Sequence, residues 1–442
     1  MERVLRWRGL LTALVSVLLL AACGSAAPAP GAEQGAGPDG QWRFDGRVLV
    51  GRVVPLTGPL ASFGAGTPYV EQQAIDAVNA LGGVVLDGRR CRLELIYADS
   101  ASSATEAAAA AQSLIAQGAD VMIVSNTADT VIPVSAACER AGKLCVSVDA
   151  PASAWLMGGP YQNSWHTFFD NEREMLCFSD VWDKVEHNGK IGLLTANDSE
   201  GVEITTFIRA FAAARSYTLV DPGRYSIGSD SYAALVDTFA REKCDILLGV
   251  MNTADFSVFW RECMAGDYRP KMCTVAKSCL FAADVETLGA LAEGLITELW
   301  WSADFPGVSS ITGMTSAGLA ADYLENCAPG LGVAPPTVGY KHANIEILYD
   351  ILRRAGTLEL SGLNRAAAET ELDTVVGRVS FGRDHVSLMP CAAGQWLQNP
   401  DGSYRQEIVG NYLMPRLPLT AEPRLIPERE GKNVNEGADC GG

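Results

Sequence analysis

The chain has 442 residues, of which 48% are hydrophobic and 19% are charged, so it is long and apolar enough to bury one or two substantial cores. Its net charge of -18 and the lack of a basic stripe exclude nucleic acid as a partner, because binding to phosphates requires concentrated Lys and Arg. Beyond the N-terminal segment, no run approaches the roughly twenty apolar residues that a membrane helix needs.

The N-terminal segment has the form of a secretory signal. Arginines precede an uncharged, leucine-rich run over residues 9–22, which is too short to span a bilayer comfortably. The run ends in Leu-Ala-Ala before Cys23, which resembles the lipobox of bacterial lipoproteins. We therefore predict a signal peptide over residues 1–22, a lipid on Cys23 and a flexible tether rich in Ala, Gly and Pro over residues 23–46. The alternative is a signal anchor that is never cleaved.

From residue 47 the sequence alternates β-branched apolar runs with helical patterns, which indicates parallel sheets wound by crossover helices. The first set of expected elements has strands at 48–54, 92–98, 121–125 and 144–148, with helices at 104–117 and 131–141. The second set has strands at 190–195, 245–250 and 271–276, with helices at 204–215, 232–241 and 256–265. Each set predicts one α/β lobe.

The last third of the chain is expected to visit both lobes. Helices at 316–325 and 343–354 return to lobe 1, whereas a strand at 377–381 and a hairpin at 395–407 return to lobe 2. The predicted domains are residues 47–168 and 300–376 for lobe 1, 169–299 and 377–414 for lobe 2, and 415–442 for a mobile tail. Three crossings between the lobes then form a hinge.

The twelve cysteines suit an oxidising compartment, where most are expected to pair. Cys138 lies late in a predicted helix and Cys145 opens the next strand, so a Cys138–Cys145 disulfide is the first candidate. The alternative is that both are buried thiols, because spacing does not fix connectivity. The four histidines are scattered without metal-ligand spacing, so we expect neither a metal site nor a cofactor.

Several segments together resemble one family. Residues 53–59 read Val-Val-Pro-Leu-Thr-Gly-Pro, Phe63-Gly64 follow, and residues 73–83 form a helix pattern that ends in two glycines. With Tyr97-Ala98-Asp99 and Ser229-Asp230-Ser231-Tyr232, this order is similar to type I periplasmic binding proteins of the leucine/isoleucine/valine-binding kind, over about residues 47–407. The resemblance implies an α/β clamshell of two Rossmann-like lobes with parallel sheets, joined by a three-segment hinge, that closes on a solute.

In open parallel sheets, ligands bind at the loops that leave the carboxyl ends of the strands. Applied to both lobes and the crossing between them, this rule and the resemblance predict these ligand-binding residues: Thr57, Phe63, Gly64, Ser125, Asn126, Thr127, Asp149, Ala150, Asn252, Phe256, Lys277 and Trp300. Some have a structural alternative, because Thr127 or Asp129 can cap the following helix and Asp149 can form a turn. Of Trp300 and Trp301, only one is expected to reach the cleft, since adjacent strand residues face opposite ways.

Lys277 departs from the family pattern, which places a carboxylate for the ligand ammonium near this position. Three interpretations remain open: Lys277 binds a ligand anion, it pairs with a protein carboxylate such as Asp149, or it lies outside the pocket. The first has a physical reason, because a buried lysine without a partner is costly and a ligand anion would supply that partner.

The resemblance implies a monomeric, extracytoplasmic, lipid-anchored solute-binding protein that works with ABC permease subunits. Its expected ligand is a small amino-acid-like or carboxylated solute, and an aromatic solute is included among these. The alternative is a ligand sensor of the same fold for a membrane receptor kinase. The motifs G-x-S-x-G, H-E-x-x-H and G-x-x-x-x-G-K-[ST] are absent from the sequence, so we predict that the protein is not an enzyme.

Overall fold

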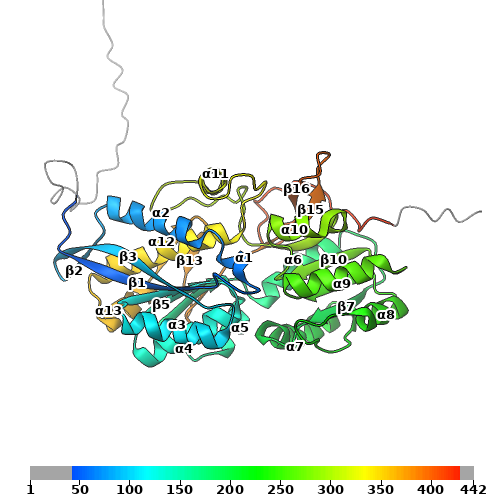
Figure 1. Ribbon diagram of the computed structural model, residues 1–442, viewed down its shortest axis with the longest axis horizontal. Helices are drawn as coiled ribbons and strands as arrows, with labels where there is room; N and C mark the ends of the chain where they lie inside the picture. Colours follow the sequence, from blue (N-terminus) through cyan, green and yellow to red (C-terminus); the bar gives the residue numbers. More distant parts are fainter. Residues whose placement is uncertain (1–41, 429–442) are drawn as a thin grey trace, which may run out of the picture. The chain divides into compact units, whose positions relative to one another are not determined.

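The computed structural model describes residues 42–428. In this part of the chain, two α/β lobes each contain a seven-stranded sheet with helices on its faces (Figure 1). The predicted signal peptide, Cys23 and most of the tether lie outside the described residues, as does the end of the predicted tail. None of the helices within residues 42–428 is long and apolar enough to cross a membrane.

Lobe 1 is built on a mostly parallel sheet. Across the sheet, its strands are β14 (Val386–Leu388), β6 (Ser164–Phe168), β5 (Cys145–Val148), β4 (Val121–Val124), β1 (Gly46–Val54), β3 (Arg89–Asp99) and β2 (Val84–Leu86). Only the pairing of β2 with β3 is antiparallel. Strands such as β4 consist of apolar residues that are all buried, as expected where helices cover both faces.

The helices of lobe 1 form two layers. They are α1 (Ala61–Gly64), α2 (Thr67–Ala80), α3 (Ala104–Ala116), α4 (Ala128–Ala141), α5 (Ala152–Met157), α11 (Ser316–Asn326), α12 (Thr337–Ala355) and α13 (Leu360–Ala368). α3 packs on α4, and α2 packs on α12 beyond the sheet (Figure 1). α12 is buried along most of its length, because α2, α11, α13 and the sheet surround it.

Lobe 2 repeats the plan with an antiparallel edge. Its strands are, in order, β16 (Tyr404–Gly410), β15 (Ala392–Gln398), β11 (Ile296–Leu299), β10 (Met272–Ala276), β9 (Ile246–Val250), β7 (Lys190–Thr195) and β8 (Thr218–Val220). Its helices are α6 (Asn171–Trp182), α7 (Ser199–Ala214), α8 (Ala233–Glu242), α9 (Thr253–Ala265) and α10 (Ala282–Leu288), with the 3-10 turn η1 (Gly289–Ala292).

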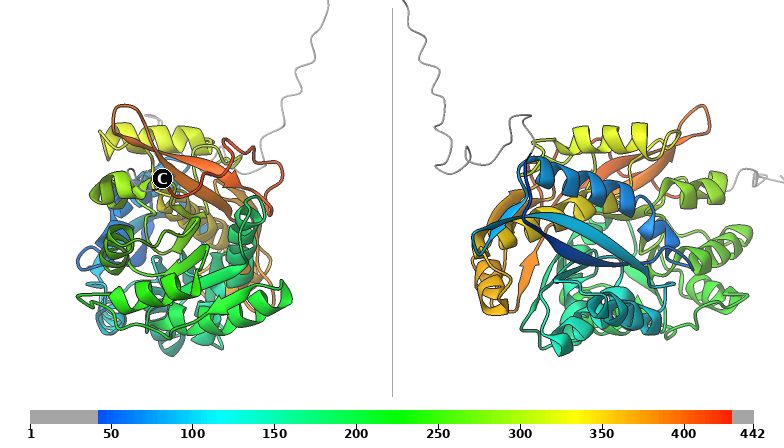
Figure 2. Two further views of the ribbon diagram at one scale, coloured as in Figure 1. Left: turned by 90° about the vertical axis from the view of Figure 1, so that its right-hand side faces the viewer. Right: turned by 60° about the vertical axis from the view of Figure 1, so that its left-hand side comes forward.

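The chain crosses between the lobes after β6, after β11 and between β14 and β15. The third crossing lies later than we predicted. The strand expected in lobe 2 is β13 (Gly377–Ser380), which pairs with β12 (Glu371–Thr374), and β14 then extends the lobe 1 sheet beside β6. The two short strands alternate exposed and buried residues, so they form a surface hairpin. Of the two segments that we expected to return to lobe 2, only the β15–β16 hairpin, orange in Figure 2, joins the lobe 2 sheet.

The first part of the predicted mobile tail is packed on lobe 2. The side chains of Leu417 and Ile426 are buried, and the backbone N–H of Ile426 donates to the Lys271 carbonyl at 2.9 Å. The Gln395 side chain donates to the Arg424 carbonyl at 2.7 Å and accepts from the Arg424 N–H at 2.8 Å. The prediction of mobility was therefore wrong for residues 415–428. Single buried residues and backbone hydrogen bonds of this kind produce no periodic pattern of apolar residues, so the sequence did not reveal them.

The cysteines of the described residues are all free thiols. Cys138 and Cys145 are buried and interact with each other, and this contact raises the pKa of Cys138 well above its ordinary value. The predicted bridge is therefore absent from the structure, which contains the alternative, a pair of buried thiols.

Candidate functional site

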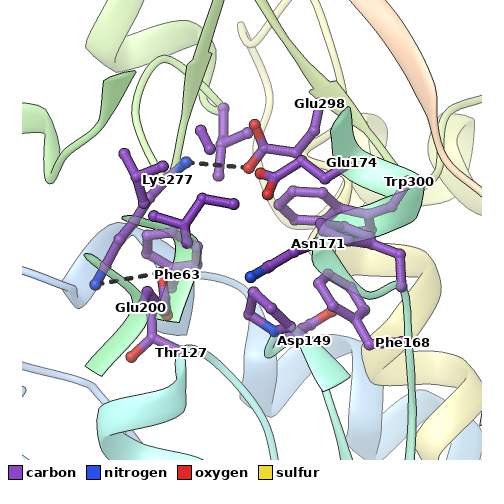
Figure 3. A pocket seen from close by; sticks show the side chains of 16 residues that line it. Phe63, Thr127, Asp149, Phe168, Asn171, Glu174, Glu200, Lys277, Glu298 and Trp300 are labelled. Carbon is purple, nitrogen blue, oxygen red and sulfur yellow. Dashed lines mark hydrogen bonds and ion pairs between the residues drawn. The ribbon is translucent and has the colours of Figure 1, made fainter. Parts of the chain in front are cut away.

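A small cavity of about 40 Å³ lies between the carboxyl ends of the strands of the two lobes (Figure 3). Its apolar lining includes Phe63, Phe168, Phe169, Ile204, Leu280 and Trp300. Both lobes contribute to the walls, so closing the lobes together encloses the space.

Five of the twelve predicted binding residues line this cavity, namely Phe63, Thr127, Asp149, Lys277 and Trp300. Phe63 from lobe 1 also meets Phe281 from lobe 2 edge to face, with ring centroids 5.0 Å apart. Trp300 lines the cavity, whereas Trp301 is buried in the core, where its Nε1–H donates to Ser316 Oγ at 3.1 Å.

Five predicted residues have other surroundings. Thr57 is exposed, and its hydroxyl donates to Asp99 Oδ2 at 2.6 Å. Gly64 packs so closely that an added Cβ would lie 2.0 Å from the Pro55 carbonyl oxygen. The Ala150 carbonyl lies 2.7 Å from His166 Nε2, Asn252 caps α9, and Phe256 is a core residue that stacks on Trp260.

The remaining two predicted residues, Ser125 and Asn126, lie one layer beneath the cavity wall. Arg52 pairs with Glu71 at 2.7 Å and donates to Ser125 Oγ at 2.6 Å. The Ser125 hydroxyl donates to Asn126 Oδ1 at 2.7 Å, and Asn126 Nδ2 donates to Asp149 Oδ2 at 3.1 Å. This buried chain of hydrogen bonds fixes the Asp149 carboxylate from below.

The backbone is strained at the same strand ends. Asn126, Thr127, Asp149 and Lys277 all have positive φ values, between 59° and 76°. Side chains other than glycine adopt this region at a cost of order 1 kcal/mol or more, and such residues cluster at binding sites. The Thr127 N–H donates to the Asp149 carbonyl at 2.9 Å, which ties two of these residues together.

Thr127 precedes α4, but its side chain makes no capping hydrogen bond. Asp129, the other candidate cap, instead accepts a hydrogen bond from the Ser199 hydroxyl of lobe 2 at 3.1 Å. The Ala128 N–H of lobe 1 also donates to Glu200 Oε1 at 3.2 Å. The start of α4 thus binds the start of α7 across the lobes.

The Lys277 ammonium completes this contact, which we call the latch: Asp129, Ser199, Asp198, Glu200 and Lys277. Lys277 Nζ lies 2.8 Å from Asp198 Oδ2, 3.4 Å from Glu200 Oε2 and 3.8 Å from Asp129 Oδ2. Burial acts to lower the pKa of Lys277, but the three carboxylates outweigh it and raise the pKa above its ordinary value. The lysine therefore pairs with protein carboxylates, although the one we named, Asp149, is not among them.

A second pair of carboxylates, Glu174 from α6 and Glu298 from β11, lies at the lobe 2 end of the cavity (Figure 3). Glu298 accepts hydrogen bonds from the Lys277 N–H at 3.0 Å and the Thr297 hydroxyl at 3.0 Å. Burial raises the pKa of Glu298 to about 8 despite these bonds. Burial and the neighbouring Glu298 raise the pKa of Glu174 well above its ordinary value.

Four buried polar atoms of the lining have no hydrogen-bond partner. They are Thr127 Oγ1, Asp149 Oδ1, Asn171 Nδ2 and Trp300 Nε1. Figure 3 shows the Asn171 amide directed into the cavity. Unpartnered buried groups cost about 1 to 3 kcal/mol each. The cavity therefore offers both donors and acceptors to a bound molecule. Within residues 42–428, no group of His, Cys, Asp or Glu is arranged to hold a metal ion.

The sequence did not identify Phe168, Asn171, Glu174 or Glu298 as part of the site. Phe168 ends β6 and Glu298 belongs to β11, two short strands that contain polar residues and that we did not predict. Had these strands been recognised, the rule that ligands bind at the carboxyl ends of strands would have nominated Phe168 and Glu298 at those ends and Asn171 just beyond β6.

Two α/β lobes with a shared cavity at their strand ends define the class of two-lobed solute-binding proteins. Residues 47–401 match the family model described as periplasmic binding protein, and the chain belongs to this family. It is 23% identical over 346 residues to the Leu/Ile/Val-binding protein BraC3 of Rhizobium johnstonii, covering 76% of this chain and 87% of the relative.

Solved structures share the fold at low identity. The leucine-binding protein LivK of Thermotoga maritima has a TM-score of 0.68 at 14% identity, with 83% of this chain and 99% of that chain covered. A solute-binding protein of an ABC transporter from Rhodopseudomonas palustris, in complex with 3,4-dihydroxybenzoic acid, has a TM-score of 0.66 at 16% identity, with 82% and 96% covered. The predicted family and clamshell fold are thus confirmed. The family is extracytoplasmic, binds small solutes, works with ABC permeases and is not enzymatic.

Proposed function

We propose that the chain is the solute-binding component of an ABC importer and that it binds a small amino-acid-like solute between its lobes. The observation that carries this proposal is the cavity, which is lined from both lobes and contains four buried polar atoms without partners. A bound solute would supply the missing hydrogen bonds, and its contacts with both walls would favour the closed form.

Relatives differ in their solutes: one is named Leu/Ile/Val-binding, and another is in complex with an aromatic acid. In this cavity, Asp149, Glu174 and Glu298 favour a solute with an amino group, because a solute with carboxylates and no amino group would place like charges together in a closed site. Both walls come from one chain, so a monomer suffices. We further propose that a lipid on Cys23 holds the protein at the outer face of the cell membrane.

A thermal-shift screen of the full chain against amino acids, amines, amides and aromatic acids tests this function, because a ligand of the folded state raises the melting temperature. Asn171→Ala removes an unpartnered donor and is expected to weaken binding of a hit by about threefold to tenfold. Asn326→Ala, at the exposed end of α11, is the control. Cells without the gene should lose uptake of the radiolabelled hit. Equal affinity in both variants would place the solute outside this cavity.

A further inference from the structure

The cavity and the layer beneath it contain more carboxylates than cations. The carboxylates are Glu71, Asp129, Asp149, Glu174, Asp198, Glu200 and Glu298, and the cations are Arg52, Lys277 and Lys341. Seven potential negative charges therefore face three positive ones. All of these groups except Asp129 and Asp198 are buried, so solvent does little to screen this excess.

Each of the three cations is already engaged. Arg52 is bound to Glu71, and Lys277 is bound within the latch. The Lys341 ammonium donates to the Phe63 carbonyl at 2.8 Å and to Thr337 Oγ1 at 2.7 Å, beneath Asp149. Asp149 is therefore partly compensated by cations from its own lobe.

Glu174 and Glu298 have no such compensation. In the described part of the chain, no lysine, arginine or histidine lies within ion-pair distance of either carboxylate. The groups that surround Glu174 from other elements are Glu298, Cys391, Glu200 and Glu203, all acidic or neutral. The two carboxylates come from different elements, α6 and β11, and both line the cavity. Neither carboxylate therefore has a counter-ion among the described residues.

We infer that the solute is an organic cation whose ammonium or guanidinium group binds between Glu174 and Glu298. This inference rests on the proposed function, since it requires the solute to occupy the cavity. A zwitterion would leave the charge excess unchanged, and an anion would increase it. The unpartnered donors Asn171 Nδ2 and Trp300 Nε1 fit a carbonyl or hydroxyl oxygen on the same solute. The aromatic walls suit a cation as well, because ring faces attract positive charge.

Calorimetric titration of the full chain with two series of probes tests this inference. Each series keeps one body and changes the charge: L-leucinol, L-leucine and 4-methylpentanoate in one, and tyramine, L-tyrosine and 3-(4-hydroxyphenyl)propanoate in the other. We expect the cationic member to bind at least about tenfold more tightly than the zwitterion, and the anion to bind most weakly. The affinity of the cationic member should rise from pH 6 to pH 8 as Glu298, whose pKa burial raises to about 8, ionises.

Charge-neutral variants locate the contact. Glu174→Gln and Glu298→Gln should each lower the affinity for the cationic probe by about tenfold or more, because a charge-assisted bond is lost. Both should also raise the melting temperature of the ligand-free protein, which shows that they fold. Glu172→Gln, on the exposed side of the same helix, should change neither property.

The outcomes separate the two claims. Tighter binding of a zwitterion or an anion, or unchanged affinity in both glutamine variants, overturns the cationic solute but leaves the solute-binding function in place. If no probe of either series binds up to millimolar concentration, the cationic solute is overturned, and the proposed function fails only if the thermal-shift screen also yields no ligand.

Discussion

Two groups of buried carboxylates lie on the lobe 2 side of the cavity and differ in what balances them. In the latch, Asp198 and Glu200 share the Lys277 ammonium with Asp129 of lobe 1. Glu298 accepts hydrogen bonds from the Lys277 N–H and the Thr297 hydroxyl, and neither Glu298 nor Glu174 forms an ion pair with a cation of the described residues. The charge of the first group is therefore neutralised within the protein, by a lysine that also holds the lobes together. The charge of the second group can be neutralised only by a proton or a bound cation. The location of the cation, more than the acidity of a cluster, decides between these roles.

Removing the latch lysine would convert the first group into the second. Lys277→Met leaves three carboxylates without a cation, and loss of one partner from a buried ion pair typically costs about 3 to 5 kcal/mol. We expect a loss of this size in the free energy of unfolding, measured by urea denaturation of the ligand-free chain.

The matched control is Lys190→Met, which removes a partly exposed lysine that donates to the Glu242 carbonyl. We expect it to cost less than about 1 kcal/mol. If Lys277→Met were as mild as this control, the latch carboxylates would not depend on the lysine, and the contrast between the two groups would fail.

The fold could be predicted where strands are apolar. β4 and β9 are short runs of buried, mostly β-branched and aliphatic residues, and their apolar character identifies them. β6 contains His166 and β11 contains Glu298, whose burial depends on hydrogen bonds from distant segments. A local pattern does not report such partners, so these strands were missed.

The site could be predicted only as a set of loops. The rule that ligands bind at the carboxyl ends of parallel strands placed Thr127, Asp149 and Lys277 at the cavity, because the direction of the strands fixes where these loops lie. It could not assign partners: Lys277 turned out to pair with the first turn of α7, and Ser125 and Asn126 turned out to support Asp149 from below. These partners are set by the packing of one lobe on the other.

The pH dependence of stability sharpens the contrast in a second way. Burial raises the pKa of Glu298 from 4.5 to about 8 and that of Asp149 from 3.8 to about 7. A carboxyl with a raised folded-state pKa binds its proton more tightly in the folded state, so its contribution is lost as the pH rises through that value. We expect the free energy of unfolding of the ligand-free chain to fall by about 1 to 3 kcal/mol between pH 6 and pH 8.

The groups that face these carboxyls set the control. Asp149 faces Lys341, Arg52, Glu71 and Asn126, and Glu298 faces Glu174, Glu200, the Lys277 N–H and the Thr297 hydroxyl. Glu298→Gln should flatten the slope measured by thermal unfolding at each pH. Glu94→Gln, which alters a surface pair with Arg47, should leave the slope as it is. A stability that rises over this interval would contradict the assignment of both carboxyls.

The smallest effect concerns the uncharged half of the latch. The Ser199 hydroxyl donates to Asp129 Oδ1 across the lobes, and Ser199→Ala removes this bond while keeping every charge of the latch. A net contribution of about 0.5 to 1.5 kcal/mol to the closed form corresponds to a loss of about twofold to tenfold in affinity for any probe that binds in the cavity. Ser113→Ala, which alters a bond to Gln117 within one exposed turn of α3, is the control. Because the lysine and its carboxylates remain, a loss of affinity as large as that of Lys277→Met in the same titration would mean that the hydrogen bond, and not the ion pairs, holds the lobes closed.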